Sequence, residues 1–278
     1  MLTISRATTR ILNTAMTRSG DDKRMNERTR FQQILGIRFF VGSEHEAIDA
    51  IICNGGLVVV PSGPGLRTLP YDEQYRRAML GADFAIPDSS LMVLIWNLIQ
   101  KDRISKLSGL KYMRALIERA EFRRLGASFW VMPTSDSAKR NVSWLKGKGI
   151  QVSQEDIYLA PMYGPVISDA ELVSRLEERR PRHVILGVGS GTQEPLGFYL
   201  KQNLSYRPAI HCIGAAIAFL SGDQARIPQW VDRLGLGWLW RCISNPMRYA
   251  PRYWDARHLV PLMLRYRDRL PIITSSSV

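Results

Sequence analysis

Apolar strand-like runs and amphipathic helix-like stretches alternate regularly between residues 50 and 220. Short β-branched runs that end at turn residues predict buried strands, as in GLVVV at 56–60, which leads into the sharp loop PSGPG at 61–65. Amphipathic stretches between such runs predict helices, as in SDAELVSRLEERR at 168–180, which opens at Ser168. This alternation predicts an α/β fold with a Rossmann-like parallel sheet flanked by helices.

Two glycine-ended apolar runs stand out within this pattern. VILGVG at 184–189 predicts a buried strand that enters the loop GVGSGTQE at 187–194, and AIHCIGAAIAFL at 209–220 repeats the pattern with Gly214. Glycines let the backbone approach a ligand, and Ser, Thr and Gln side chains can hydrogen-bond to it. Adjacent strand ends at the carboxyl edge of a parallel sheet are where doubly wound folds bind nucleotides. The candidate nucleotide-binding residues are Gly189, Ser190, Gln193, Glu194 and Gly214, and a plain turn is the alternative.

A third strand end carries a carboxylate. ADFAIPD at 82–88 predicts a short strand ending at Asp88, and Ser89 and Ser90 then begin a strongly apolar helix, LMVLIWNLI at 91–99. An Asp at this position is typical of a catalytic or ligand-binding group, but Asp is also a good helix N-cap. Both interpretations of Asp88 stay open at this point.

The composition of the chain limits the classes of molecule that it is expected to bind. The 278 residues carry 38 basic and 25 acidic side chains, a net charge of +13, which favours nucleic acid, a phosphorylated substrate or anionic lipid as partner. Cys53, Cys212 and Cys242 form no CxxC pair and lie in apolar runs, which predicts buried reduced thiols and a cytosolic compartment. No run is long enough to span a bilayer, and no apolar signal segment opens the chain. No DxD pair occurs and the four histidines are scattered, so no metal site is expected.

The two ends of the chain differ from its middle. Residues 1–30 hold seven basic and three acidic residues with little periodicity, which predicts a mobile basic arm. Residues 223–278 contain nine arginines, no lysine and four of the seven tryptophans, and Pro246 and Pro251 divide this tail into short helices. The tail could sit on anionic lipid or clamp phosphate, and a plain helical cap with solvated arginines is the alternative.

Several blocks resemble one family. GVGSGTQE, IGAAIAFLSG and ARIPQWVDRLGLGWLWRCISNPMRYAPRY follow the order and spacing of the WecG/TagA/CpsF bacterial glycosyltransferases, and the resemblance covers roughly residues 34–255. ADFAIPD resembles that family's AD…PDG strand, whose Asp is the proposed catalytic base, and Ser62 falls on the family's Asn. The family's arginines are kept, together with a tyrosine, at Arg226, Arg241, Arg248, Arg252 and Tyr253.

The resemblance implies an inverting transferase that moves an N-acetylhexosamine from a UDP-sugar to a sugar on a polyprenyl diphosphate, in cell-surface polysaccharide synthesis. It implies Asp88 and Ser62 as catalytic residues and no metal or other cofactor, with the arginines Arg226, Arg241, Arg248 and Arg252 offsetting the charge of the departing UDP. It also implies a cytoplasmic protein that is peripheral on the inner face of the membrane. Its tail would touch an anionic surface, and a homo-oligomer is left open.

Departures from the family pattern keep alternatives open. They fall in the loops that would face donor and acceptor, at Val60, Ser62, Ser89, Leu110, Gly191, Thr192, Ala218, Gly237 and Asn245. The sugar or the acceptor could therefore have changed, or activity could be lost. A basic nucleic-acid-binding α/β protein is a competing interpretation, although no nucleic-acid motif occurs. A nicotinamide oxidoreductase is disfavoured because no early G-x-G-x-x-G is present.

Overall fold

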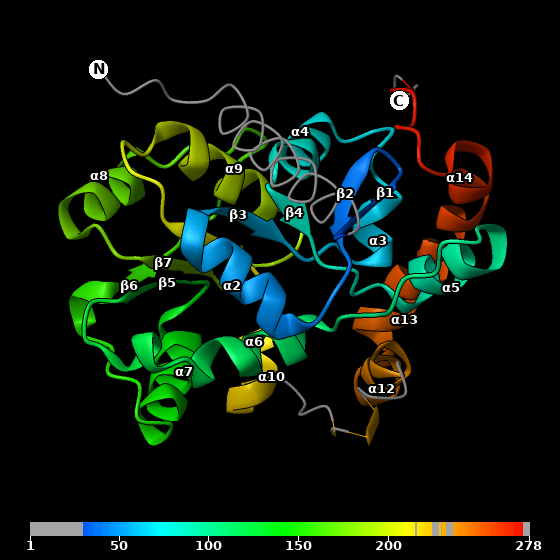
Figure 1. The fold of residues 1–278 in the computed structure, drawn as a ribbon. Coiled ribbons are helices and arrows are strands. Elements are labelled where there is room, and N and C mark those ends of the chain that lie inside the picture. The colour runs from blue at the N-terminus through cyan, green and yellow to red at the C-terminus, as the bar shows by residue number, and fades with distance from the viewer. Residues whose placement is uncertain (1–29, 215, 224–227, 229, 232–235, 275–278) are drawn as a thin grey trace, which may run out of the picture.

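The computed structural model describes residues 30–214, 216–223, 228, 230–231 and 236–274. Its centre is an eight-stranded sheet with strand order β1-β2-β4-β3-β8-β7-β5-β6 (Figure 1). Only the β1–β2 pair is antiparallel among the described strand pairs. The strands are β1 (Phe31–Ile34), β2 (Ile37–Phe40), β3 (Gly56–Val59), β4 (Phe84–Ala85), β5 (Ser128–Met132), β6 (Ile157–Leu159), β7 (His183–Leu186) and β8 (Ala209–Cys212). The predicted α/β class with a mainly parallel, Rossmann-like sheet is confirmed.

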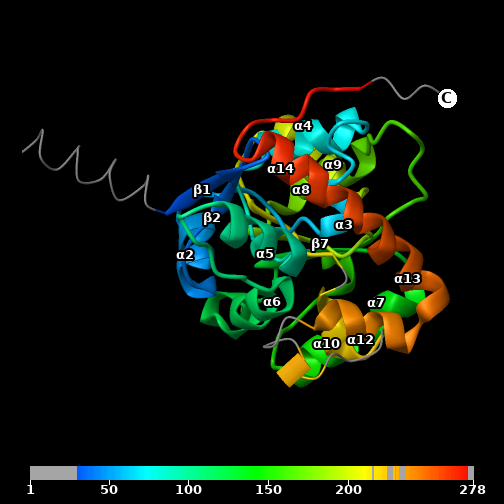
Figure 2. The same cartoon turned by 90° about the vertical axis from the view of Figure 1, so that its right-hand side faces the viewer.

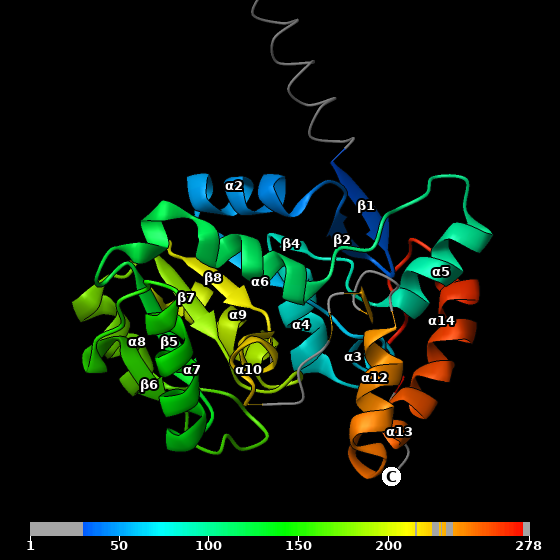
Figure 3. The same ribbon diagram turned by 90° about the horizontal axis from the view of Figure 1, so that it is seen from below.

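Helices cover both faces of the sheet (Figures 1 and 3). Successive residues of β3 point to opposite faces, so Leu57 and Val59 join one apolar core while Val58 joins the other. The first core is closed by α3 (Gly63–Leu66), α4 (Glu73–Gly81), α5 (Ser90–Ile99), α8 (Ala170–Arg179), α9 (Gln193–Asn203) and α14 (Leu259–Tyr266). The second is closed by α2 (Glu44–Asn54), α6 (Gly109–Glu118), α7 (Ser135–Gly147) and α10 (Ala216–Ser221).

Local details correct three expectations. Asp169, and not Ser168, caps α8, because its carboxylate accepts from Leu172 N at 2.9 Å and also from the hydroxyls of Tyr158 and Tyr163. The loop at 61–65 contains the one-turn helix α3, since Ser62 caps it and a proline lies in its first turn. Cys53 is exposed near the end of α2, whereas Cys212 is buried and Cys242 half-buried.

The described part of the C-terminal tail is helical, as predicted. It forms α12 (Gly237–Ser244), α13 (Pro246–Asp255) and α14, and Figure 2 shows them in succession along one side of the molecule, with α14 beside α5. Leu259 and Met263 of α14 are buried in the first core, and Arg267 O accepts a hydrogen bond from Leu35 N in the β1–β2 turn. The last helix therefore packs on the sheet domain. The predicted arm at 1–30 lies outside the described residues except for Arg30.

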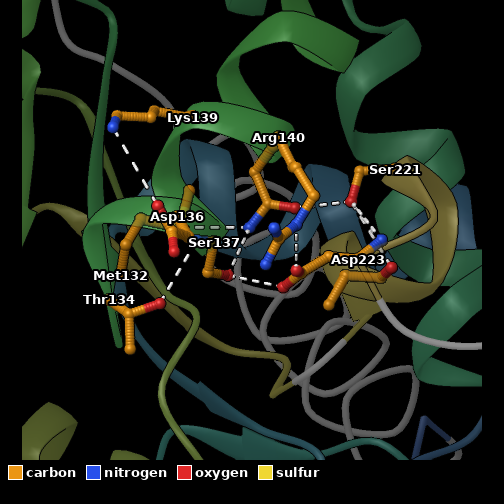
Figure 4. Close-up of polar contacts among 10 residues, drawn as sticks. Met132, Thr134, Asp136, Ser137, Lys139, Arg140, Ser221 and Asp223 are labelled. Carbon is orange, nitrogen blue, oxygen red and sulfur yellow. Dashed lines mark hydrogen bonds and ion pairs between the residues drawn. The ribbon is translucent and has the colours of Figure 1, made fainter.

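A polar network fixes the position where this tail begins (Figure 4). Asp223 follows α10, and its carboxylate accepts from Ser137 Oγ at 2.6 Å and pairs with Arg140 at 2.5 Å. Ser221 Oγ donates to Asn141 Oδ1 at 2.6 Å. Because Ser137, Arg140 and Asn141 all belong to α7, these contacts join the end of α10 to α7.

Across the described ranges, no helix has both the length and the apolar content needed to cross a bilayer.

Candidate functional site

A cavity of about 1230 Å³ lies at the carboxyl ends of β4, β3, β8 and β7, which are neighbours in the sheet. Each strand end contributes polar lining: Ser62 after β3, Asp88 after β4, Ser190 after β7 and Gly214 after β8. Helices α12 and α13 provide further lining, including Arg241. The parallel β7–β8 pairing places the two glycine junctions side by side, as predicted from the sequence.

The environment of Asp88 separates its two interpretations. Ser89, and not Asp88, caps α5, because Ser89 Oγ accepts from Met92 N at 3.2 Å. Asp88 Oδ1 instead accepts from Gly109 N, the first residue of α6, at 3.0 Å. Among the described residues, no hydrogen bond reaches Asp88 Oδ2. The carboxylate is thus held through one oxygen at the positive end of a neighbouring helix, and its other oxygen is available to a ligand in the cavity.

Ser62 lies close to Asp88 on the cavity wall. Its hydroxyl accepts from Gly65 N at 3.3 Å and so begins α3. A Cβ atom on Gly63 would lie 3.1 Å from Ser89 Oγ, so glycine allows α3 to approach the start of α5. The Ser62 hydroxyl keeps its own proton for a ligand, because the capping bond uses the oxygen as acceptor.

Gln193 and Glu194 hold the glycine-rich loop in place through hydrogen bonds. Gln193 Oε1 accepts from Gly214 N at 2.6 Å, and its Nε2 donates to Glu194 Oε1 at 3.0 Å. The Glu194 carboxylate also accepts from Gly191 N at 2.7 Å and from Ser190 Oγ at 3.3 Å. Burial raises the pKa of Glu194 above its ordinary value, and the side chain does not line the cavity. Gln193 and Glu194 therefore join the loop after β7 to the loop after β8, while Gly189 and Ser190 line the cavity.

Arg241 faces the cavity from α12. Its Nη1 donates to Tyr253 Oη at 3.0 Å, and its guanidinium lies 4.5 Å from the centre of the Phe219 ring. Its Nε is buried and has no hydrogen-bond partner among the described residues. Burial raises the pKa of the Tyr253 hydroxyl, and the negative charge of Asp88 adds to that increase. Arg241 and Tyr253 therefore form a hydrogen-bonded pair in the cavity that Asp88 also lines.

Comparison with known proteins decides the family. The model of the glycosyl transferase WecG/TagA/CpsF family matches residues 32–271. The chain belongs to the WecG/TagA/CpsF family. A relative from Bacillus spizizenii, 23% identical over 206 residues that cover 70% of this chain and 74% of the relative, is named N-acetylglucosaminyldiphosphoundecaprenol N-acetyl-beta-D-mannosaminyltransferase. A relative from Bacillus subtilis with the same name is 24% identical over 181 residues, 64% of this chain and 67% of the relative.

The positions of the other predicted phosphate-binding arginines cannot be compared with the cavity. Arg226 lies outside the described residues, and the side chains of Arg248 and Arg252 on α13 lie outside them as well. Their role as a phosphate clamp stays a prediction.

Sequence analysis missed two cavity residues as candidates. Lys106 lines the cavity from the loop before α6, and Leu107 N donates to Pro87 O at 3.1 Å, which brings this loop beside Asp88. No ion pair of Lys106 occurs within the described part of the chain. A lone loop lysine carries no sequence signal, because most such lysines are solvated. Tyr253 is kept from the family pattern, and only the structure shows that it contacts Arg241.

The histidines are less scattered than expected. His183 and His211, on adjacent strands β7 and β8, lie with Nδ1 and Nε2 3.3 Å apart in the second core, and a 2.9 Å hydrogen bond joins Tyr112 Oη to His211 Nδ1. Burial lowers the pKa of His183 from 6.5 to about 4, so both rings are neutral at neutral pH. Within the ranges the structure describes, no three His, Cys, Asp or Glu side chains gather as a metal site. That the protein needs no metal stays a prediction.

Proposed function

We propose that the protein is an inverting glycosyltransferase that moves an N-acetylhexosamine from a UDP-sugar to a sugar carried on a polyprenyl diphosphate. The observation that supports it most is the Asp88 carboxylate, which is held through Oδ1 by Gly109 N and belongs to a residue that lines a large cavity. Both named relatives act on an N-acetylglucosaminyl-diphospho-undecaprenol. Such chemistry belongs to cell-surface polysaccharide synthesis at the inner face of the membrane.

In the proposed reaction Asp88 is the general base. Its Oδ2 takes the proton from an acceptor hydroxyl while that oxygen forms a bond to the anomeric carbon of the donor. The bond from this carbon to the β-phosphate oxygen of UDP breaks at the same time, and UDP leaves with the electron pair. Attack from the face opposite the leaving group inverts the anomeric configuration. The Gly109 N–H holds the Asp88 carboxylate in a fixed orientation before the proton moves.

The departing UDP develops negative charge, and Arg241 is the described cation placed to offset it. Arg241 lines the cavity, where its Nη groups can donate to phosphate oxygens, and the neighbouring Tyr253 hydroxyl can donate to the same group. Lys106 supplies a second positive charge on the α5 side of the cavity. We place Arg226, Arg248 and Arg252 in the same role by family resemblance.

The glycine-rich loop suits the uncharged part of the donor. Glu194 already takes hydrogen bonds from Gly191 N and Ser190 Oγ, and its buried carboxylate lies beneath the start of α9. Because Glu194 already accepts from Gly191 N, this N–H before the start of α9 is not free to bind a phosphate group. We therefore place the nucleoside at Gly189, Ser190 and Gly214, and the diphosphate on the Arg241 side.

The test uses Asp88→Asn in a transfer assay with UDP-sugars and a lipid-linked or short-chain acceptor. Loss of the base should lower turnover by at least about a hundredfold. UDP binding and the melting temperature should stay native, because Asn keeps the acceptor oxygen for Gly109 N. Asp102→Asn, on an exposed turn outside the cavity, is the matched control. Near-native turnover of Asp88→Asn would remove Asp88 from catalysis, and salt-dependent DNA retention without UDP-sugar binding would favour the nucleic-acid alternative instead.

A further inference from the structure

The cavity changes character along its length. Near the strand ends its lining is polar, with Ser62, Asp88 and Ser190. Between α5 on one side and α12 and α13 on the other, the lining becomes apolar. We name this part the apolar groove, and its walls are Leu91, Leu94, Trp238, Cys242, Met247 and Trp254.

The side chains of the apolar groove are exposed although they are large. Leu94 is 58% exposed, Met247 88% and Trp254 70%. A contiguous set of exposed apolar side chains marks a binding surface more often than a chance feature. Since these residues also line the cavity that holds Asp88, a ligand in the groove would be continuous with the reacting groups.

Contacts behind the groove hold its two walls in place. The guanidinium of Arg67, at the end of α3, pairs with Asp255 at the end of α13. On the other side, α14 packs against α5 through Leu259 and Met263, which are fully buried in the first core. The groove is therefore a preformed surface, which lowers the entropy cost of binding a flexible chain.

We propose that the apolar groove binds the first isoprene units of the acceptor's prenyl chain. This inference rests on the proposed function, because it assigns the lipid part of the same acceptor. The acceptor consists of a sugar, a diphosphate and a prenyl chain in that order. The α5 side of the cavity offers the Asp88 carboxylate, the Lys106 ammonium and the apolar wall around Leu94 as matching partners. Lys106 is fixed near Asp88 by the Leu107 N to Pro87 O bond, and the loop before it is tied to α5 by Asn97, which accepts from Ile104 N at 2.9 Å.

A groove for one chain and a surface that rests on a membrane make different demands on neighbouring residues. Leu98 of α5 is 76% exposed and Ile243 of α12 is 69% exposed, yet neither lines the cavity. A flat membrane contact would use Leu98 and Ile243 as much as Leu94 and Met247. Of these four side chains, a chain bound in the groove would touch only Leu94 and Met247. Leu98 is a control for Leu94, because both are exposed leucines of α5. Ile243 is a control for Met247, because both are exposed apolar side chains of α12 and α13.

The experiment measures binding to the full-length protein by isothermal titration, with geranylgeranyl diphosphate below its micelle concentration and with inorganic pyrophosphate as the head group alone. The wild type should bind the prenyl diphosphate at least about tenfold more tightly than pyrophosphate. Leu94→Ser and Met247→Ser should each weaken prenyl diphosphate binding about tenfold, which corresponds to about 1.4 kcal/mol. Leu98→Ser and Ile243→Ser should bind it as the wild type does, and all four variants should keep the native melting temperature because the changed side chains are exposed.

Two results would overturn the groove. One is native affinity in both Leu94→Ser and Met247→Ser, and the other is an equal loss in all four variants, which would indicate a general apolar surface. Because the titration needs no sugar transfer, the expected pattern in a protein that transfers no sugar would support the groove while refuting the proposed function. Asp88-dependent transfer without the pattern would refute the groove alone.

Discussion

Replacing Arg241 separates a phosphate clamp from a plain helical cap. Arg241→Ala removes a cation from the cavity, the 3.0 Å hydrogen bond to Tyr253 and the guanidinium 4.5 Å from the Phe219 ring. If Arg241 binds the leaving phosphate in a partly desolvated cavity, its charge-assisted hydrogen bonds contribute about 1.5 to 3 kcal/mol. At about 1.4 kcal/mol for each factor of ten, kcat/KM should fall by roughly 10- to 150-fold. The kcat/KM of Arg241→Lys should lie between those of the wild type and Arg241→Ala, because lysine keeps the charge but lacks the planar guanidinium.

The stability cost of the same change should be small. A guanidinium stacked on a ring contributes about 0.5 to 1 kcal/mol at a solvent-accessible position. Arg38→Ala is the matched control, because Arg38 also stacks on a ring, 4.2 Å from the centre of Phe31, and neither residue lines the cavity. It should lose a similar stability without losing transfer.

The assay is steady-state transfer to a short-chain, water-soluble acceptor, so that membrane binding does not enter the rate. Melting temperatures of the three variants report the fold. If Arg241→Ala keeps kcat/KM within twofold of the wild type at native stability, the clamp is refuted and the helical cap is the better account of the tail.

The strand ends could be located from sequence because their chemistry is local. Gly189 at the end of VILGVG and Asp88 at the end of ADFAIPD mark where the backbone must turn, and both residues line the cavity in the structure. Strand order could not be read in this way. β8 lies between β3 and β7 although some 150 residues separate it from β3, and no local pattern encodes that pairing.

Side-chain roles were harder to predict than positions. Gln193 lines the cavity as a ligand-binding amide would, but it is also buried and its oxygen accepts from Gly214 N, a contact that a one-dimensional pattern cannot reveal. The sequence also suits Asp88 to capping the helix that follows it, but the hydroxyl of Ser89 occupies that capping position. α14 illustrates the same limit, because its amphipathic sequence does not specify which surface Leu259 and Met263 cover.

Two further changes test the loop and the buried histidines. Gly189→Val should fold normally, because a Cβ atom there meets nothing within 4 Å, but it should weaken UDP binding at least about tenfold by filling the loop surface. Gly164→Val, at an exposed loop glycine with the same open surroundings, is its control, and native UDP affinity of folded Gly189→Val would reduce the loop to a turn. His183 is 0% exposed and its pKa is lowered from 6.5 to about 4 by burial, so the unfolded chain takes up a proton below pH 6.5 that the folded protein refuses until about pH 4. The free energy of unfolding should therefore fall as the pH drops through this window, by about 2 kcal/mol between pH 7.5 and 5.0 from this group. Urea unfolding at both pH values should show that decrease in the wild type and in the exposed control His45→Gln, and a smaller one in His183→Gln. An equal decrease in all three proteins would show that other groups set the acid sensitivity, since only a side chain whose protonation differs between the folded and unfolded states can change stability with pH.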